Sequence, residues 1–211
     1  MHVYSEIAKH FDETRHTPWP SVVDFIKSKK ANRSSRIALD IGCGNGKYLS
    51  ALTESASAVF ACDTCPELLE CAKQKIASSH SVEFTLASGT NLPYAGAMFD
   101  MVICVAVLHH LETPAERQTF MNEIYRVLKP GAQALVTVWN TEAAKPDKWR
   151  NIRGNDYAVP WHDKYSNIVH DRFYHLFTGQ EMFEMAKASN FRVIKLANER
   201  GNWYAVLQKS L

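Results

Sequence analysis

Residues 39–46 read Leu39-Asp40-Ile41-Gly42-Cys43-Gly44-Asn45-Gly46. This glycine-rich segment follows an apolar run over residues 37–41 and opens a helical pattern over residues 47–54. It therefore predicts a strand, a tight turn and a helix, in which glycine lets the backbone approach a ligand and the helix N-terminus offers unpaired N–H groups. An acidic residue, Asp63, ends the next apolar run 23 residues after Asp40. Such an acid hydrogen-bonds a ribose diol in doubly wound sheets, so the pattern favours a nucleoside-cofactor site over a purely structural turn.

Apolar runs and helical patterns alternate along the rest of the chain. Further strands are expected in short apolar or β-branched runs, at residues 59–62, 82–86, 101–105, 134–138, 191–196 and 203–207. Helices are expected over residues 66–78, from the Thr113 capping box to a stop at Pro130-Gly131, and after a second capping box at Thr178. This alternation predicts an α/β fold with a mostly parallel sheet covered by helices on both faces.

Two regions depart from the alternation. Residues 1–35 predict one or two helices outside the sheet, separated by residues 15–20. Residues 140–177 are polar, aromatic and without a regular period, which predicts a long irregular but ordered segment with a functional role. We expect a single domain over residues 1–211, in which residues 36–139 bind the cofactor, residues 1–35 and 140–177 build the acceptor site, and residues 178–211 add a terminal helix and strands.

Composition limits the class of protein. The chain has 211 residues, 46% of them hydrophobic, which suffices for one large core. Lys and Arg number 24 against 22 Asp and Glu, so a polyanionic partner would have to meet a local basic patch. No long apolar stretch and no secretory signal pattern occurs, and the five cysteines are irregularly spaced, so we expect a soluble cytoplasmic, possibly also nuclear, protein without a disulfide framework. The Cys62-Cys65 CxxC pair lacks a second Cys or His pair, so buried thiols are favoured over a metal site.

Asp40 is informative about which cofactor the glycine turn would bind. A carboxylate there would repel a pyrophosphate, but it would hydrogen-bond an amino group or pair with a cation such as the ammonium or sulfonium of S-adenosylmethionine. Residues 40–46 resemble the cofactor motif of class I S-adenosylmethionine-dependent methyltransferases, residues 99–111 resemble their fourth-strand motif, and residues 126–131 resemble the segment before their fifth strand. The resemblance covers about residues 35–140.

The resemblance implies a Rossmann-like, mostly parallel seven-stranded sheet and S-adenosylmethionine as the cofactor. The residues that it implies for cofactor binding are Asp40, Gly42, Gly44, Asn45, Gly46, Asp63, Ser88, Gly89 and Val105. Ser88 stands where that family often has an aspartate that receives the adenine amino group. Because a hydroxyl accepts this hydrogen bond without charge assistance, we expect weaker cofactor affinity.

The flanks carry a narrower resemblance. They are similar to those of the tRNA wobble-uridine carboxymethyl methyltransferases at residues 4–8, 15–20, 42–49, 138–140, 159–161 and 172–177. The resemblance implies transfer of methyl from S-adenosylmethionine to the carboxylate of 5-carboxymethyluridine in a tRNA anticodon loop. It also implies a heterodimer with a small zinc-binding activator subunit. The 82–86 strand would be an apolar sheet edge suited to that partner.

A carboxylate acceptor is already ionised at neutral pH, so positioning matters more than a strong base. Among candidate catalytic residues, Arg15 is expected to grip the carboxylate, with His16, His110 and His175 as hydrogen-bond donors. The candidate substrate-binding residues are Tyr4, Trp19, Asn140, Trp161 and Arg172, of which Trp19 and Trp161 offer stacking faces for the base. His109 fits a core position as well as a site position, and Trp139 fits a core position better than a stacking platform.

A basic run could contact RNA phosphates or could be a solvated helix end. It comprises Lys27, Lys29, Lys30, Arg33 and Arg36, joined by Lys145, Lys148, Arg150 and Arg153. Two alternatives stay open at this point. One is a small-molecule methyltransferase with His109 or His110 as general base, and the other is a methyltransferase-like RNA-binding subunit without turnover.

Overall fold

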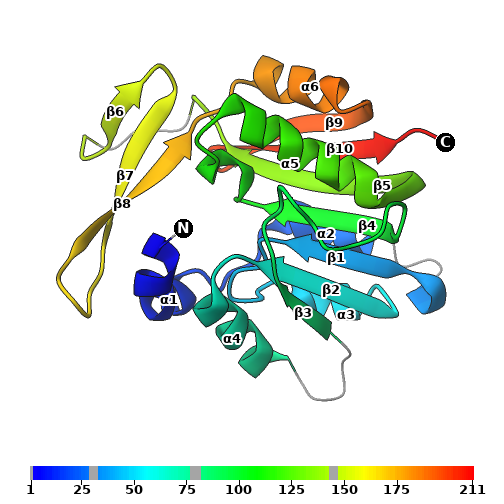
Figure 1. The fold of residues 1–211 in the computed structure, drawn as a ribbon, viewed down its shortest axis with the longest axis horizontal. Coiled ribbons are helices and arrows are strands. Elements are labelled where there is room, and N and C mark those ends of the chain that lie inside the picture. The colour runs from blue at the N-terminus through cyan, green and yellow to red at the C-terminus, as the bar shows by residue number, and fades with distance from the viewer. Residues whose placement is uncertain (1, 29–32, 77–81, 143–146) are drawn as a thin grey trace.

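A seven-stranded sheet organises the protein (Figure 1). The computed structural model describes residues 2–28, 33–76, 82–142 and 147–211. The sheet order is β3-β2-β1-β4-β5-β10-β9, in which the first five strands run parallel and β10 is antiparallel to both neighbours. The strands are β1 (Ile37–Ile41), β2 (Ala58–Asp63), β3 (Val82–Leu86), β4 (Phe99–Val105), β5 (Leu128–Trp139), β9 (Phe191–Glu199) and β10 (Asn202–Lys209). The predicted seven-stranded, mostly parallel sheet is confirmed.

Helices cover both faces of this sheet because successive residues of its inner strands are apolar. On β1, Leu39 and Ile41 pack in one core cluster and Ala38 packs in the other. The first cluster is completed by α5 (Pro114–Val127) and α6 (Gly179–Ala188). The second is completed by α2 (Pro20–Lys27), α3 (Leu49–Thr53) and α4 (Pro66–Lys75).

The start of α5 agrees with the sequence prediction, but its end does not. The Thr113 capping box is present, with the Thr113 hydroxyl accepting from the Glu116 backbone N–H. The predicted stop at Pro130-Gly131 is wrong, because α5 ends at Val127 and Leu128 is already extended, with φ −70° and ψ 140°. Pairing of Leu128 with Phe99 draws the chain into β5, which contains Pro130 and Gly131 and shifts register against β4 there.

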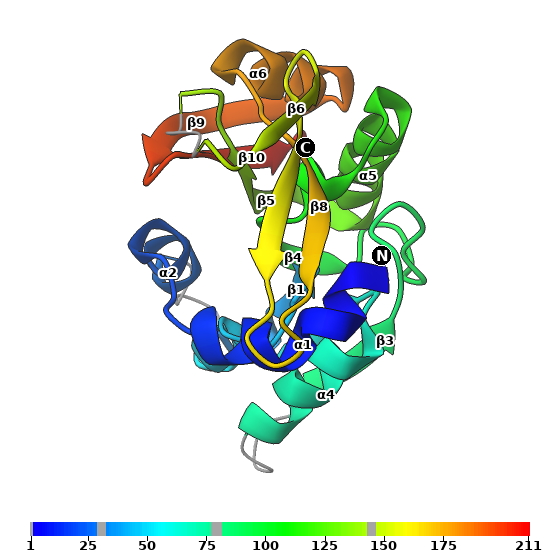
Figure 2. The same cartoon turned by 90° about the vertical axis from the view of Figure 1, so that its left-hand side faces the viewer.

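Residues 140–177 are more regular than expected. They contain a three-stranded antiparallel sheet of β6 (Arg150–Arg153), β7 (Asp156–His162) and β8 (Val169–His175). The prediction of an irregular segment is wrong. All of β6 and the first residues of β8 are exposed or partly exposed, so these strands keep many polar residues and show no clean alternation of apolar and polar side chains. The β7–β8 hairpin extends from the main sheet and its tip lies over α1 (His2–Thr14) (Figure 2).

Two short 3₁₀ helices, η1 (Arg33–Ser35) and η2 (Leu108–His110), complete the described elements. All five cysteines are free, as expected, and four of them are buried. Among the described helices, none combines the length and the apolar character needed to cross a membrane.

Candidate active site

A cavity of about 940 Å³ opens at the carboxyl ends of β1, β2 and β4. Its other walls come from α1, η2, β7 and β8. In the sheet order, β1 lies between β2 and β4. The strands that directly follow β1 in the chain, β2 and β3, lie on one side of it, and β4 and β5 lie on the other side. Open α/β sheets bind ligands at such a switch point, so this cavity is the candidate active site.

The predicted glycine turn forms the floor of the cavity. Gly42 has a φ of +69°, and a Cβ there would lie 2.3 Å from Cγ2 of Val107, so only glycine fits. The Gly44 N–H donates to Oδ2 of Asp63 at 2.8 Å, and the Cys65 N–H donates to Oδ1 at 2.9 Å. Asp63 is thereby fixed against the turn at the cavity wall.

Asp40 is the most unusual group in this wall. It lines the cavity, is 1% exposed, and its Oδ2 atom has no hydrogen-bond partner within the described residues. Burial, reinforced by the nearby charge of Asp63, raises the pKa of Asp40 to about 7. Lys47 lines the same cavity, and burial lowers its pKa to about 8. The sequence analysis missed Lys47, although its place directly after the glycine turn was a usable signal.

Two arginines, Arg15 and Arg172, also line the cavity. The guanidinium carbons of Arg15 and Arg172 lie 5.0 Å and 4.8 Å from the ring of Trp161. Arg172 is 9% exposed, and its Nε atom has no partner. Partial burial and the neighbouring Arg172 charge lower the pKa of Arg15. In the described part of the chain neither arginine forms an ion pair with a carboxylate, so the pair is ready to bind an anion.

Trp161 does not offer a free stacking face. It is 6% exposed, covered by the two guanidiniums and by Phe11, and its indole N–H donates to Nδ1 of His10 at 3.2 Å. The prediction of Trp161 as a base platform is therefore wrong, and the ring instead supports the arginines. Trp19 does line the cavity and stays partly exposed.

His110 cannot act as predicted. Its Nδ1 donates to the Phe173 carbonyl at 3.0 Å, since a carbonyl only accepts, and its Nε2 therefore accepts from the Tyr4 hydroxyl at 2.8 Å. Burial lowers the pKa of His110 to about 4, which keeps the ring neutral. His110 thus has no N–H free for an acceptor and holds Tyr4 in the wall. His109 is buried and stacked on Tyr174, in line with a core role.

A methyltransferase domain model matches residues 39–136 of the chain. The tRNA (carboxymethyluridine(34)-5-O)-methyltransferase of Schizosaccharomyces pombe is 30% identical over 99% of this chain and 95% of its own length. The chain belongs to this tRNA (carboxymethyluridine) methyltransferase family. The Arabidopsis thaliana member of the family is 42% identical over a match that spans 75% of this chain and 37% of that longer protein.

Solved structures agree with the methyltransferase fold. S-adenosylmethionine-bound CalS10, an amino pentose methyltransferase from Micromonospora echinaspora, superimposes with a TM-score of 0.76, 17% identity and coverage of 96% of both chains. A putative methyltransferase in complex with the Haloferax volcanii Trm112 methyltransferase activator gives a TM-score of 0.71, 17% identity, and coverage of 100% of this chain and 96% of that one. This tRNA methyltransferase family member is an S-adenosylmethionine-dependent enzyme, and the Asp40 carboxylate, whose Oδ2 atom has no partner among the described residues, lines the cavity and fits the positive charge of that cofactor.

The cavity of this family member includes most of the predicted cofactor residues. Those that line it are Asp40, Gly42, Gly44, Asn45, Asp63, Ser88, Gly89 and Val105. Gly46 is a correction, because it packs against Ala72 and does not line the cavity. Asn45 lines the cavity, but its amide donates to Oδ1 of Asp12 at 2.9 Å, which ties the end of α1 to the glycine turn.

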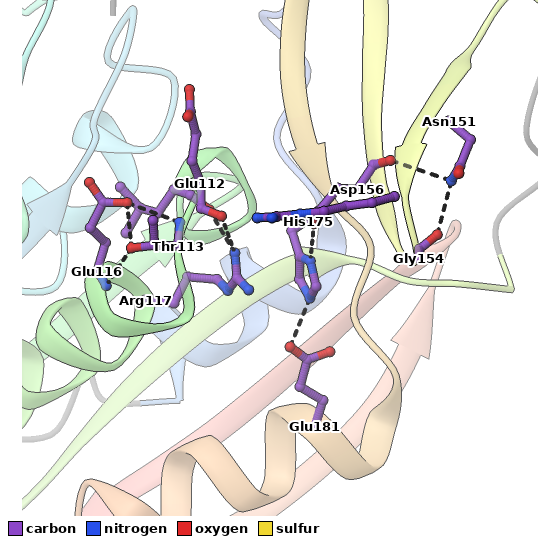
Figure 3. A network of polar contacts seen from close by, with 11 residues as sticks. Glu112, Thr113, Glu116, Arg117, Asn151, Gly154, Asp156, His175 and Glu181 are labelled. Carbon is purple, nitrogen blue, oxygen red and sulfur yellow. Dashed lines mark hydrogen bonds and ion pairs between the residues drawn. The ribbon is translucent and has the colours of Figure 1, made fainter.

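Three predicted acceptor residues lie outside the cavity. His16 is exposed and contacts only the Glu13 carbonyl, at 3.1 Å. Asn140 is fully buried, with its backbone N–H donating to Gly201. His175 is held between Asp156 and Glu181 (Figure 3). In the described structure none of these three side chains reaches the cavity: His16 is exposed in the loop after α1, while strand alternation and long-range pairing, which one sequence does not reveal, hold Asn140 and His175 away from it.

The predicted basic run is only partly present at the site of this methyltransferase. Lys29, Lys30, Lys145 and the Arg33 side chain lie outside the described residues. Arg150 and Arg153 are ion-paired with Asp171 and Asp156, each at 3.0 Å. Lys27 is exposed, and neither it nor Arg36 lines the cavity. Lys148 does line it, together with Arg200 from the β9–β10 turn, which the sequence analysis missed.

Proposed function

We propose that this protein transfers the methyl group of S-adenosylmethionine to the carboxylate of 5-carboxymethyluridine at the wobble position of tRNA, giving the methyl ester. The observation that carries the proposal is the pair Arg15 and Arg172, two cations in the cavity wall that form no ion pair with a carboxylate in the described part of the chain. Two neighbouring guanidiniums bind a carboxylate and disfavour an amine. The names of the curated relatives point to the same substrate.

The cofactor would lie over the glycine turn and bring an electrophilic methyl group. Asp40 would pair with its ammonium, Asp63 would accept from the ribose hydroxyls, and the Ser88 hydroxyl would accept from the adenine amino group. Lys47, whose ammonium lies 5.4 Å from the Trp19 ring, would meet the cofactor carboxylate. Opposite charges in the wall would thus match the charges of the amino-acid part.

The acceptor carboxylate would be held by Arg15 and Arg172 with one oxygen directed at the methyl group. No proton has to be removed, because a carboxylate is ionised at neutral pH, and closure of the cavity would strip water from the anion. Trp19 remains the candidate for stacking the uracil ring. His110, with both ring nitrogens engaged, gives no support to the alternative of a histidine general base for a small-molecule acceptor.

The direct test incubates the protein with labelled S-adenosylmethionine and tRNA that carries 5-carboxymethyluridine. Nuclease digestion and mass spectrometry should identify the methyl ester, which mild alkali hydrolyses. The control is the same tRNA with unmodified uridine, which offers no carboxylate. Label on the control tRNA, or no label on either tRNA with the activator present, would refute the proposal.

Binding of tRNA should depend on Lys148 and Arg200 at the mouth of the cavity. We expect the variant with Lys148→Glu and Arg200→Glu to bind tRNA at least about 10-fold more weakly at 0.15 M salt. The slope of the logarithm of the binding constant against the logarithm of the salt concentration should become smaller by about one to two, because fewer counterions are released on binding. The matched control is Lys187→Glu, which changes an exposed lysine of α6. Equal binding of both variants across a salt titration would remove this surface from the RNA path.

We further propose that a zinc-binding activator subunit docks on β3. This strand pairs only with β2 and forms one edge of the sheet, and Leu86 on it is 61% exposed. Exposed apolar edges favour strand addition, and a structural neighbour of this chain was solved in complex with the Haloferax volcanii Trm112 methyltransferase activator. The five free thiols suit the cytoplasm or nucleus, where we place the reaction.

Leu86→Lys should weaken co-purification with the activator at least about 10-fold, because a leucine that becomes fully buried in an interface contributes on the order of 1.5–3 kcal/mol. Ile194→Lys is the matched control, since Ile194 is 43% exposed on β9 at the opposite edge of the sheet. Loss of the complex with Ile194→Lys and not with Leu86→Lys would move the partner to the other edge.

A further inference from the structure

His175 lies between two carboxylates at the end of β8 (Figure 3). Its Nδ1 is 2.6 Å from Oδ1 of Asp156, and its Nε2 is 2.7 Å from Oε1 of Glu181. The residue is 8% exposed. An ionised carboxylate only accepts hydrogen bonds, so both ring nitrogens have to donate, and the ring that satisfies both contacts is the imidazolium.

The charges around this ring are compatible with that state. Arg153 donates to Oδ2 of Asp156 at 3.0 Å, and Arg117, whose charge acts on both carboxylates, donates to the Leu111 carbonyl at 2.8 Å. Burial raises the pKa of Asp156, but hydrogen bonds from His175 and Arg153 outweigh it and lower that pKa overall. The nearby His109 is kept neutral, since burial lowers its pKa well below the usual value. The Phe177 ring completes the contacts in a T-shaped arrangement with His175, with the ring centroids 4.8 Å apart.

The three residues join elements that belong to different sheets. Asp156 lies on β7 and pairs in register with His175, while Glu181 lies in the first turn of α6, which packs on β9 of the main sheet. Along β8, alternate side chains point to opposite faces. Arg172 and Tyr174 line the cavity, and His175 points away from it toward α6.

We propose that His175 is a positioning residue: as a doubly donating imidazolium it clamps the small sheet to α6 and so fixes Arg172 in the acceptor site. This rests on the proposed function of Arg172 in binding the acceptor carboxylate. A neutral ring would turn a lone pair toward one of the two carboxylates and release one side of the clamp. The cofactor site, built on the other sheet, would be untouched.

The test compares Glu181→Gln with Glu184→Gln, which changes an exposed residue of the same helix. For Glu181→Gln we expect KM for the carboxymethyluridine tRNA to rise about 10-fold, with unchanged calorimetric affinity for S-adenosylhomocysteine and faster amide exchange over residues 169–175. Glu184→Gln should leave all three unchanged. His175→Phe should resemble Glu181→Gln, and if it does not fold, Glu181→Gln carries the test alone.

Nitrogen-15 spectra of the wild-type histidines supply a signature that a merely structural ring would not give. The nitrogen signals of His175 are those that disappear in His175→Phe or that shift in Glu181→Gln. Both ring nitrogens of His175 should carry protons at pH 7.5. A neutral His175, or exchange and KM values equal in Glu181→Gln and Glu184→Gln, would overturn the proposal. If wild-type protein fails to methylate the tRNA, the proposed function fails, while the nitrogen signals and amide exchange still decide whether the clamp exists.

Discussion

Asp40→Asn is expected to make the protein more stable at pH 8 and to abolish cofactor binding. Burial and Asp63 raise the pKa of Asp40 to about 7, from an ordinary value of 3.8. Between these two values the folded protein keeps a proton that the unfolded chain has lost, so stability falls as pH rises. At about 1.4 kcal/mol per pKa unit, the ionised carboxylate costs up to about 4 kcal/mol above pH 7. Asparagine keeps the shape of the side chain and carries no charge.

Urea unfolding at pH 8 and at pH 4 measures the first effect. The gain for Asp40→Asn should be about 2–4 kcal/mol at pH 8 and should shrink to about 0.5 kcal/mol at pH 4, where Asp40 stays protonated in the folded protein and about 40% of the unfolded chains carry the proton. Calorimetry with S-adenosylmethionine measures the second, and we expect at least about 100-fold weaker binding, since the group that meets the ligand cation is gone. Asp171→Asn, an exposed carboxylate paired with Arg150, is the control for both. A variant that loses stability at pH 8, or that binds cofactor as wild type does, would contradict this account of the cavity.

Arg172→Leu is expected to lower kcat/KM for the carboxymethyluridine tRNA by about 1000-fold. The side chain supplies one of two guanidiniums to the acceptor end, where a charge-assisted hydrogen bond in a desolvated site is worth on the order of 3–4 kcal/mol. The fold should tolerate the change, because it relieves repulsion between Arg172 and Arg15. Arg172→Lys should recover part of the rate, since it restores the charge without the planar fork.

Steady-state kinetics on the same tRNA, with cofactor affinity measured separately, checks this expectation. Arg150→Leu removes an arginine of the same small sheet that is 68% exposed and lies outside the cavity. Its kinetics should match those of wild type. If Arg172→Leu and Arg150→Leu reduce the rate equally, Arg172 acts on sheet stability and does not hold the acceptor.

Local patterns were sufficient for the cofactor half of the molecule. The glycine turn after β1 and the acid at the end of β2 are each read within a few residues, and the turn geometry at Gly42 admits no other residue. The Thr113 capping box also formed as predicted, because its two hydrogen bonds join residues only three apart. Alternation of apolar runs gave the parallel sheet, since such strands must be buried on both faces.

The acceptor half could not be derived in this way. The end of α5 moved because Leu128 pairs with Phe99, 29 positions away in the chain. The small sheet was missed because its exposed strands keep polar residues and lack a clean period. His110 changed role because Phe173 and Tyr4 occupy its two nitrogens, which no local pattern encodes.

By itself the sequence determined the order of the strands of the main sheet and of the helices that cover it, the cofactor turn and the position of Asp40 and Asp63, because these depend on short-range hydrogen bonding and on the period of apolar residues. Only the tertiary structure decided that Arg15 and Arg172 both pack on the ring of Trp161, that His175 faces α6, and that Arg200 reaches the cavity. The physical reason is that such contacts join residues far apart in the chain, and their geometry is set by the packing of whole elements.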